Sequence, residues 1–390
     1  MAKRIQQRRM IAVLVETDNS WGREVIQGIA SYAKQCAPNW DLLIDPRDRQ
    51  GRLHLPAGWK GDGVIARFSS KTLVNQVRKT KVPTVDVDTF MLNQKWMGHV
   101  ITDDDERIRL VLEHLKERGF DKLAFYAPPS RSYSGERERA LRKAASSISF
   151  DYVTYKPGYP ANKKIGWSDR QQYVSKWLKS LPRPIGVFAA DERCGRQLAE
   201  ICHWEGIRVP EDIAIICGRT DELMCNVTEP ALTSVVLASD RLGYEASEIL
   251  QSMIQGRKPP AKPRLIKPVS VIPRQSTDIL AIDNTLLADA IRYIRVHATQ
   301  GASVEDVLEQ VPISRRTLEM QFRSLLGRTP AEEIRRVRLT RAKLLLAQTD
   351  LSIGEVAHAC GFSGAARLSV SIRQAIGVTP REYRRSSRGQ

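Results

Sequence analysis

The sequence predicts a two-lobed α/β domain followed by an all-α domain with two helix-turn-helix motifs. Three observations support this fold class. Short apolar runs alternate with amphipathic stretches from Met10 to about Pro273, as in repeated strand–helix units. The alternation restarts after Asp103, which indicates two lobes with a cleft between them. After Ile279 the apolar pattern takes the helical period, and one helical unit recurs about 50 residues later.

The first lobe begins with an apolar run, Ile11–Glu16, followed by an amphipathic helix over Gly22–Gln35. Further strands are expected at Trp40–Asp45, Gly63–Phe68 and Thr84–Asp88, with a helix at Lys71–Lys79 between the last two. The strands are mostly apolar, which is typical of strands buried on both faces of a parallel sheet. We therefore expect an open, mainly parallel sheet with right-handed crossovers.

The second lobe repeats the same order of helix and strand. The expected helices are Asp104–Arg118, Glu136–Ser146, Asp169–Ser180 and Gly195–Glu205, and the expected strands are Lys122–Pro128, Asp151–Tyr155, Ile185–Ala190 and Ile213–Cys217. The segment Gly256–Asp278 is rich in proline and basic residues, and we expect it to hold a last strand and then a linker. In such sheets a ligand binds beyond the carboxyl ends of the strands.

The sequence predicts that the C-terminal part is helical throughout. A first helix is expected over Leu286–Ala298, and Ser303, with Asp306 three residues later, predicts a capping box. Three further serines, Ser314, Ser352 and Ser363, are expected to cap short helices, and Ala331–Gln348 reads as a long connecting helix. The pairs of short helices match the helix-turn-helix plan. The expected domains are residues 8–275, a linker at 276–285, and residues 286–390.

Charge indicates the partner of the C-terminal part. The chain has 390 residues and a formal net charge of +17 at pH 7. From Arg335 to Arg388 it carries 11 basic and 3 acidic residues. A basic stretch of this kind indicates a polyanion partner, most simply double-stranded DNA. Exposed basic residues on the second helix of each unit point the same way, because that helix enters the major groove in helix-turn-helix proteins.

Composition excludes several classes of protein. Hydrophobic residues make up 42% and charged residues 27%, which excludes wholesale disorder. No apolar run approaches the ~18 residues of a membrane span, and Met10–Val15 is too short for a secretion signal. We therefore expect a cytoplasmic protein with no membrane partner. The six cysteines lack zinc spacing and no nucleotide or nucleophile motif occurs, so we expect no metal, no cofactor and no enzyme activity.

Particular motifs carry a resemblance to known families. Ser303–Arg384 resembles an AraC-type DNA-binding domain, with SIGEVAHACGF and GVTPREYRR as its signature. The preceding part resembles a LacI-type, periplasmic-binding-protein-like sugar domain in VITDDDERIRLVLEHLKERGFDKLAFYAP, SGERERALRKA, IRVPEDIAIICG, EPALTSVVL and RQST. The order of the two domains resembles the xylose-operon regulators over nearly the whole chain. The resemblance implies a sugar-controlled homodimer that binds operator DNA and activates transcription, with RNA polymerase as a partner.

The resemblance also implies which residues face DNA. In the first motif they are Ser314, Arg315, Arg316, Thr317, Glu319, Met320 and Arg323; in the second they are Ser363, Ala365, Ala366, Arg367, Val370 and Arg373. The second set departs from the family pattern, because Ala365, Ala366 and Val370 cannot read donor and acceptor groups on bases. We expect the first motif to supply most sequence discrimination. The second would add phosphate contacts from Arg367 and Arg373 and apolar contacts with methyl groups.

The effector would bind in the cleft. The candidates follow strand ends or match ligand-gripping positions of LacI-type domains: Asp18, Asn19, Trp21, Arg23, Asp88, Arg137, Asp191, Arg219 and Asp221. The family usually has an aspartate where this chain has Arg219. Because a guanidinium cannot accept a hydrogen bond, three alternatives remain open. The ligand is a sugar acid, Asp221 takes over the acceptor role, or Arg219 pairs internally with an acid such as Asp191.

A second function is an alternative to sugar sensing. The chain could be a DNA-binding regulator or architectural protein whose α/β domain mediates dimerisation without a sugar ligand. The two hypotheses differ in whether a small molecule stabilises the protein. A periplasmic sugar-binding protein is disfavoured by the helical repeat and by the lack of a signal segment.

Overall fold

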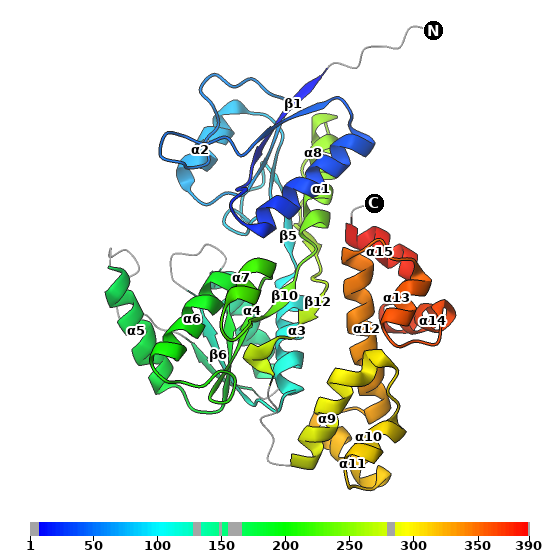
Figure 1. Ribbon diagram of the computed structural model, residues 1–390. Helices are drawn as coiled ribbons and strands as arrows, with labels where there is room; N and C mark the ends of the chain where they lie inside the picture. The colour runs from blue at the N-terminus through cyan, green and yellow to red at the C-terminus, as the bar shows by residue number, and fades with distance from the viewer. Residues whose placement is uncertain (1–7, 128–133, 148–149, 155–165, 279–284, 389–390) are drawn as a thin grey trace.

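The computed structural model describes residues 8–127, 134–147, 150–154, 166–278 and 285–388. It has two α/β lobes, one above the other, and a helical domain that runs alongside both (Figure 1). The two mainly parallel sheets followed by helices confirm the predicted fold class. Six of the expected linker residues, 279–284, lie outside the described part of the chain.

The first lobe is built on a six-stranded sheet in the order β11-β5-β4-β3-β1-β2, and its pairs are parallel. The strands are β1 (Arg9–Leu14), β2 (Trp40–Ile44), β3 (Gly63–Ala66), β4 (Thr84–Asp86), β5 (Gly98–Thr102) and β11 (Arg264–Ile266). Ile11 and Val13 pack in one cluster with helices α1 (Ser20–Cys36) and α8 (Ser239–Ile254). Ala12 and Leu14 pack in another with α2 (Lys71–Thr80). Successive side chains of β1 thus reach opposite faces, as a strand buried on both sides requires.

Helices α1 and α8 cross in very close contact. A Cβ atom added to Gly28 of α1 would lie 1.8 Å from the carbonyl oxygen of Asp240, and one added to Gly243 of α8 would lie 2.0 Å from that of Val25. Only glycine allows two helix backbones to approach so closely. The crossing holds α8, which comes late in the chain, against the first helix of the lobe.

The second lobe has a six-stranded sheet in the order β12-β10-β9-β8-β6-β7. The strands are β6 (Lys122–Tyr126), β7 (Asp151–Thr154), β8 (Ile185–Ala189), β9 (Ile213–Cys217), β10 (Thr233–Val236) and β12 (Ser270–Ile272). Its pairs are parallel except β10 with β12, which is antiparallel. The helices of this lobe are α3 (Asp104–Lys116), α4 (Ser134–Ser147), α5 (Trp167–Ser180), α6 (Glu192–Trp204) and α7 (Glu222–Val227).

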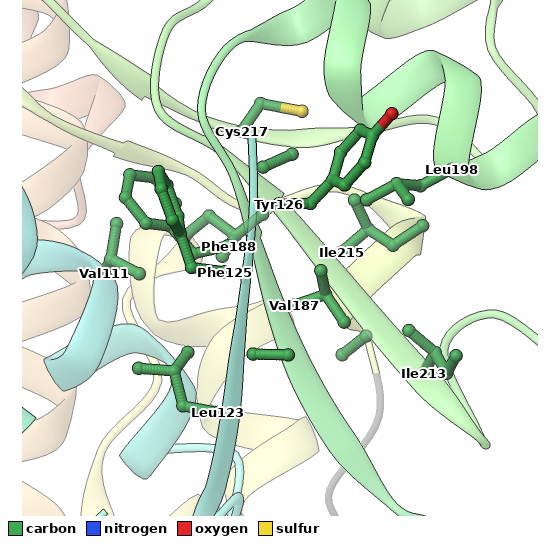
Figure 2. Packing of buried hydrophobic residues seen from close by; sticks show 14 of the residues in the cluster. Val111, Leu123, Phe125, Tyr126, Val187, Phe188, Leu198, Ile213, Ile215 and Cys217 are labelled. Carbon is green, nitrogen blue, oxygen red and sulfur yellow. The ribbon is translucent and has the colours of Figure 1, made fainter. Parts of the chain in front are cut away.

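Buried side chains alternate across the second sheet (Figure 2). Phe125 and Phe188, with ring centroids 5.4 Å apart, lie on the face that meets Val111 of α3. The next residue of β6, Tyr126, lies on the opposite face beside Leu198 of α6. Both faces of the sheet are therefore covered by helices, which explains the apolar composition of its strands.

The lobes are not two successive units, as the sequence analysis expected. The chain crosses between them three times: from β5 to α3, from β10 to α8, and from β11 to β12. The segment Gly256–Asp278 holds two strands, one in each sheet, where one strand was expected. Three chain segments therefore connect the two lobes, an arrangement that suits hinge motion of one lobe against the other.

The helical domain contains α9 (Thr285–His297), α10 (Val304–Gln310), α11 (Arg315–Leu326), α12 (Pro330–Gln348), α13 (Ile353–Ala359), α14 (Ala365–Ile376) and α15 (Pro380–Arg388). Short 3₁₀ turns occur at Gln275–Thr277 and Ala298–Gln300. Capping boxes begin α10 at Ser303 and α13 at Ser352, and Ser314 caps α11, as predicted. The prediction for Ser363 was wrong: the N-cap residue of α14 is Gly364, which has no side chain to cap the helix.

Two separate cores hold the helical domain together. Val307, Leu318 and Phe322 belong to the first, and Leu368 and Ile372 to the second. Each core contains residues from one pair of short helices and from the long helix α12, and α9 also supplies much of the first core. The two helix-turn-helix units are thus held on one shared helix, as the internal repeat predicted.

Candidate functional site

A pocket opens between the two lobes at the carboxyl ends of several strands. Its walls come from both lobes and from the crossing segments: Trp21, Arg67, Val87, Asp88, Thr89, Ile101, Thr102, Asp104, Arg107, Arg137, Asp191, Arg219 and Leu237. It encloses about 490 Å³ of space, counting its open mouth. This location agrees with the rule that ligands bind beyond the carboxyl ends of parallel strands.

The first-lobe wall is centred on Arg67, which directly follows β3. Its Nε donates to Asp88 Oδ2 at 2.9 Å, and its Nη1 lies 3.4 Å from Glu16 Oε2. The guanidinium carbon lies 5.2 Å from the ring centroid of Trp21, a cation–π contact. Burial opposes the charge of Arg67, but the two carboxylates outweigh it and raise its pKa above the ordinary value. The first-lobe wall therefore combines the apolar indole of Trp21 with the charge of Arg67, which the carboxylates of Asp88 and Glu16 balance.

The second-lobe wall is centred on Asp104, the first residue of α3. Its Oδ1 lies 3.2 Å from Arg107 Nε and accepts a hydrogen bond from Arg137 Nε at 3.4 Å. Arg137 also donates to the carbonyl oxygen of Ala190. Asp191 begins α6 as its N-cap and accepts from the Cys194 backbone N–H at 2.8 Å. Four polar side chains with fixed geometry thus line the pocket from this side: Asp104, Arg107, Arg137 and Asp191.

Arg219 is held by Glu192, the residue that follows Asp191. Its Nη2 donates to Glu192 Oε1 at 2.7 Å and its Nε donates to Glu192 Oε2 at 2.9 Å. Glu192 is buried, so this is a bidentate pair in a largely dry setting. Of the three alternatives that the sequence left open, this geometry favours internal pairing.

Four of the nine candidate ligand residues do not line the pocket. Asn19 caps α1 and Asp221 caps α7 through backbone N–H groups at 2.9 and 3.1 Å, respectively. Arg23 donates to the Thr17 carbonyl oxygen at 2.9 Å, and Asp18 is exposed. Asp221 also accepts a bond from the Ser20 backbone N–H of the other lobe at 3.4 Å. These side chains hold backbone and lobes in place around the pocket.

The remaining polar residues of the pocket lining were not predicted from the sequence. These are Arg67, Thr89, Thr102, Asp104 and Arg107. A signal existed for Arg67, because it lies at the end of an expected strand. Asp104 and Arg107 begin a helix that follows β5, and that strand was not recognised, so nothing in the sequence pointed them toward the cleft.

The second helix of each helix-turn-helix unit presents the predicted DNA-facing residues to solvent. On and next to α11, Ser314, Arg315, Arg316, Met320 and Arg323 are exposed, while Thr317 and Glu319 are half-buried. On and next to α14, Ser363, Ala365, Ala366, Arg367, Val370 and Arg373 are all exposed. Met320 and Val370 are 62% and 51% exposed and hold the same sixth position of their helices. Large apolar side chains at such positions suit contact with thymine methyl groups.

The long helix α12 fixes the second unit through a direct contact. Arg335 of α12 donates to the side-chain oxygen of Gln374 in α14. On the first unit, Arg315 Nη2 lies 2.6 Å from Glu305 Oε1 of α10. These contacts orient the two outward helices relative to their own units.

Other kinds of site find no support in the described ranges. No cluster of three or more histidine, cysteine, aspartate or glutamate side chains could hold a metal ion there. All six cysteines are free thiols, and five of them are buried. No helix among the described residues combines the length and the apolar character that crossing a membrane requires.

Three family models match successive parts of the chain. A model of the XylR N-terminal domain matches residues 10–105, one of a periplasmic binding protein-like domain matches 112–277, and one of a helix-turn-helix domain matches 307–386. The Xylose operon regulatory protein of Escherichia coli K12 is 31% identical over 383 residues, 97% of either chain. The chain belongs to the xylose operon regulator family. A Haemophilus influenzae member is 29% identical and covers 96% of this chain and 97% of its own.

Solved structures agree with this family. The structure of xylose-binding transcription activator xylR is 30% identical, has a TM-score of 0.62, and covers 97% of this chain and 98% of its own. A LacI family regulator from Mycobacterium smegmatis, 20% identical with a TM-score of 0.55, covers 68% of this chain and 98% of its own, and shares the fold of the two lobes. As a member of the xylose operon regulator family, the chain is an AraC-type DNA-binding regulator with a sugar-binding domain, and not an enzyme.

Proposed function

We propose that this chain is a cytoplasmic transcription activator of a carbohydrate catabolic operon and that a neutral monosaccharide, D-xylose first, controls it from the interlobe pocket. The observation that carries this proposal is the bidentate pair between Arg219 and Glu192. A guanidinium already engaged by a buried carboxylate has little capacity for the carboxylate of a sugar acid.

The charges of the whole pocket support a neutral ligand. Each arginine of its lining has an acidic partner: Arg67 pairs with Asp88, Arg107 and Arg137 with Asp104, and Arg219 with Glu192. Hydroxyl groups of a neutral sugar can donate to the carboxylates and accept from the guanidiniums without disturbing this balance. Trp21 offers an apolar surface for the C–H face of the ring. The names of the relatives, which include a xylose-binding activator, support D-xylose as the first candidate.

On the DNA side, we propose that α11 and α14 enter two successive major-groove segments of an operator. Arg316, Glu319 and Met320 would read bases, while Arg367 and Arg373 would contact phosphates. A homodimer would bind paired half-sites, and sugar-dependent reorientation of its helical domains would recruit RNA polymerase.

Thermal denaturation against a panel of sugars tests this function. A ligand at 100 times its dissociation constant stabilises the protein by about 2.7 kcal/mol. We expect the melting midpoint to rise with D-xylose and to stay unchanged with D-xylonate. Arg137→Ala should abolish the rise, because Arg137 lines the pocket. Arg142→Ala is the matched control on the same helix, since Arg142 pairs with Glu138 at the surface. No shift with any sugar would instead favour a regulator whose α/β domain only mediates dimerisation.

A further inference from the structure

Helix α3 links the two functional regions of the chain. Its first residue, Asp104, and Arg107 on its first turn line the interlobe pocket. Its other end reaches the helical domain through Glu117, the residue at which the helix ends. With 13 residues and a rise of about 1.5 Å per residue, the helix spans about 20 Å. One rigid element thus touches both the proposed effector site and the DNA-binding domain.

At the far end of α3, Glu117 joins Arg328, Glu333 and Arg336 in the interdomain ion-pair cluster, and Glu113 of α3 lies at its edge, with its Oε1 3.9 Å from Arg328 Nη1. Glu117 Oε1 lies 2.7 Å from Arg328 Nη2, and its Oε2 lies 2.8 Å from Arg336 Nη2. Glu333 joins the same two arginines, at 3.0 Å from Arg328 Nε and 2.8 Å from Arg336 Nη2. Glu117 is the member that the α/β domain supplies, and both carboxylates are buried.

A backbone contact reinforces this junction. Arg295 of α9 donates from Nη2 to the carbonyl oxygen of Glu117 at 2.7 Å. The end of α3 is therefore held by three arginines of the helical domain, from α9, from the turn before α12 and from α12 itself. The buried carboxylate of Glu117 depends on these arginines, because losing them would leave an unpaired charge inside the protein, which costs free energy.

The helical domain also rests on the other lobe, through a different kind of contact. Leu344 and Ala347 of α12 pack against the apolar cluster of the first lobe. Helix α15 lies against α8 of the first lobe, and α12 also runs beside β12, a strand of the second lobe (Figure 1). The domain thus bridges both lobes, and the ion-pair cluster lies on the second.

We propose that Glu117 is the positioning residue that couples the interlobe pocket to the DNA-binding domain. Apolar contacts tolerate sliding, whereas hydrogen-bonded ion pairs depend on distance and angle. When the lobes change their angle around a ligand, the helical domain cannot keep both contacts unchanged. The ion-pair cluster makes it follow α3, and the orientation of α11 and α14 changes with the lobe that carries Asp104. This inference rests on the proposed function, because it requires a ligand in the pocket.

The test measures coupling in the full-length protein. The dissociation constant for a DNA duplex selected by the wild type from a random pool is measured with and without saturating D-xylose, for wild type, Glu117→Gln and Arg336→Gln. We expect a change of about 5-fold or more for the wild type, within the usual range of allosteric coupling. Both variants should reduce this factor to less than about 2, and by reciprocity DNA should no longer change their xylose affinity.

Several controls separate coupling from a loss of structure. Xylose binding to the DNA-free variants must stay within about 2-fold of wild type, which shows that both lobes are folded, because the pocket lies about 20 Å away. Lys116→Gln on α3 changes an exposed residue in the last turn of the same helix. Arg338→Gln on α12 changes a residue that bonds carbonyl oxygens of its own domain, Ala298 and Ala302. Both controls should keep the wild-type factor.

The double variant Glu117→Gln/Arg336→Gln should show no further loss beyond either single variant, because both changes break the same contact. Variants at Glu117 and Arg336 that bind xylose and retain the full wild-type factor would overturn the coupling role and leave the proposed function standing. If saturating D-xylose leaves the DNA dissociation constant of the wild type unchanged, both the proposed function and the coupling role of Glu117 are overturned.

Discussion

Glu192 holds the guanidinium of Arg219 by two parallel hydrogen bonds, of 2.7 and 2.9 Å, at the edge of the interlobe pocket. The two residues follow the ends of neighbouring strands, β8 and β9, of the second sheet. Arg219 is therefore paired inside the protein. Asp88, Asp104 and Asp191 line the same pocket.

Removing the charge of Glu192 should change which ligand the pocket accepts. In Glu192→Gln, the fork of Arg219 becomes available to a carboxylate, and hydrogen bonds to charged groups contribute about 1.5–3 kcal/mol. We expect D-xylonate to gain roughly tenfold or more in affinity, measured by isothermal titration calorimetry. Glu200→Gln, on the same helix but paired with Arg196 at the surface, should change nothing. A wild type that already prefers D-xylonate to D-xylose contradicts the proposed role of the pair.

Arg316 and Arg373 should contribute differently to DNA binding, although both are exposed on the second helix of their unit. Arg316 lies in the first turn of α11, where side chains reach base edges, and Arg373 lies near the end of α14. We expect Arg316→Ala to cost about 1–3 kcal/mol on a selected duplex and much less on random DNA. Arg373→Ala should weaken binding to the selected duplex and to random DNA alike. It should also reduce the slope of log affinity against log salt concentration by about 1. Electrophoretic titrations decide this, and equal losses for both variants on both DNAs would refute it.

Met320 and Val370 should each contact a thymine methyl group, because they are exposed apolar side chains at the same position of the two outward helices. Replacing the contacted thymine by uracil removes one methyl group, worth about 0.8 kcal/mol and thus roughly fourfold in affinity. We expect this loss for the wild type and its absence in Met320→Ala at one site and Val370→Ala at the other. Thymines outside the footprint serve as the control. Equal sensitivity of wild type and variants to uracil argues against methyl contact.

Local signals in the sequence explain why much of the helical domain was predicted correctly. The caps Ser303, Ser314 and Ser352 depend only on a side chain and a backbone N–H three residues later. Ser363 failed because one extra glycine, Gly364, shifts the start of α14 by one residue. A helix cap can thus be predicted from sequence when it depends only on residues that are close to each other in the chain.

The pocket depends on contacts that local patterns do not encode. Strand β5 was missed because His99 interrupts its apolar run, although this histidine is buried in the fold. Strand β11 has three residues, of which Arg264 and Leu265 are exposed, and it exists because it pairs with β5 of a distant segment. The pairing of Arg219 with Glu192 likewise depends on adjacent strands. Strand ends located candidate residues, but only the assembled lobes decide which of them face the ligand.

His114 should make the stability of the protein fall below neutral pH. Its Nε2 lies 2.8 Å from Thr277 Oγ1 and its Nδ1 lies 3.1 Å from Arg118 Nη1, so Nδ1 accepts and the ring is neutral. Burial, and then the charges of Arg118 and other arginines, hold the pKa of His114 well below its ordinary value. Below pH of about 6.5 the unfolded chain binds a proton that the folded chain excludes, so the free energy of unfolding falls by up to about 1.4 kcal/mol per pH unit. Above that pH the effect disappears. Urea titrations from pH 5 to 8 should show a shallower fall for His114→Gln than for wild type, with exposed His203→Gln as control, and parallel curves for all three would count against this role of His114.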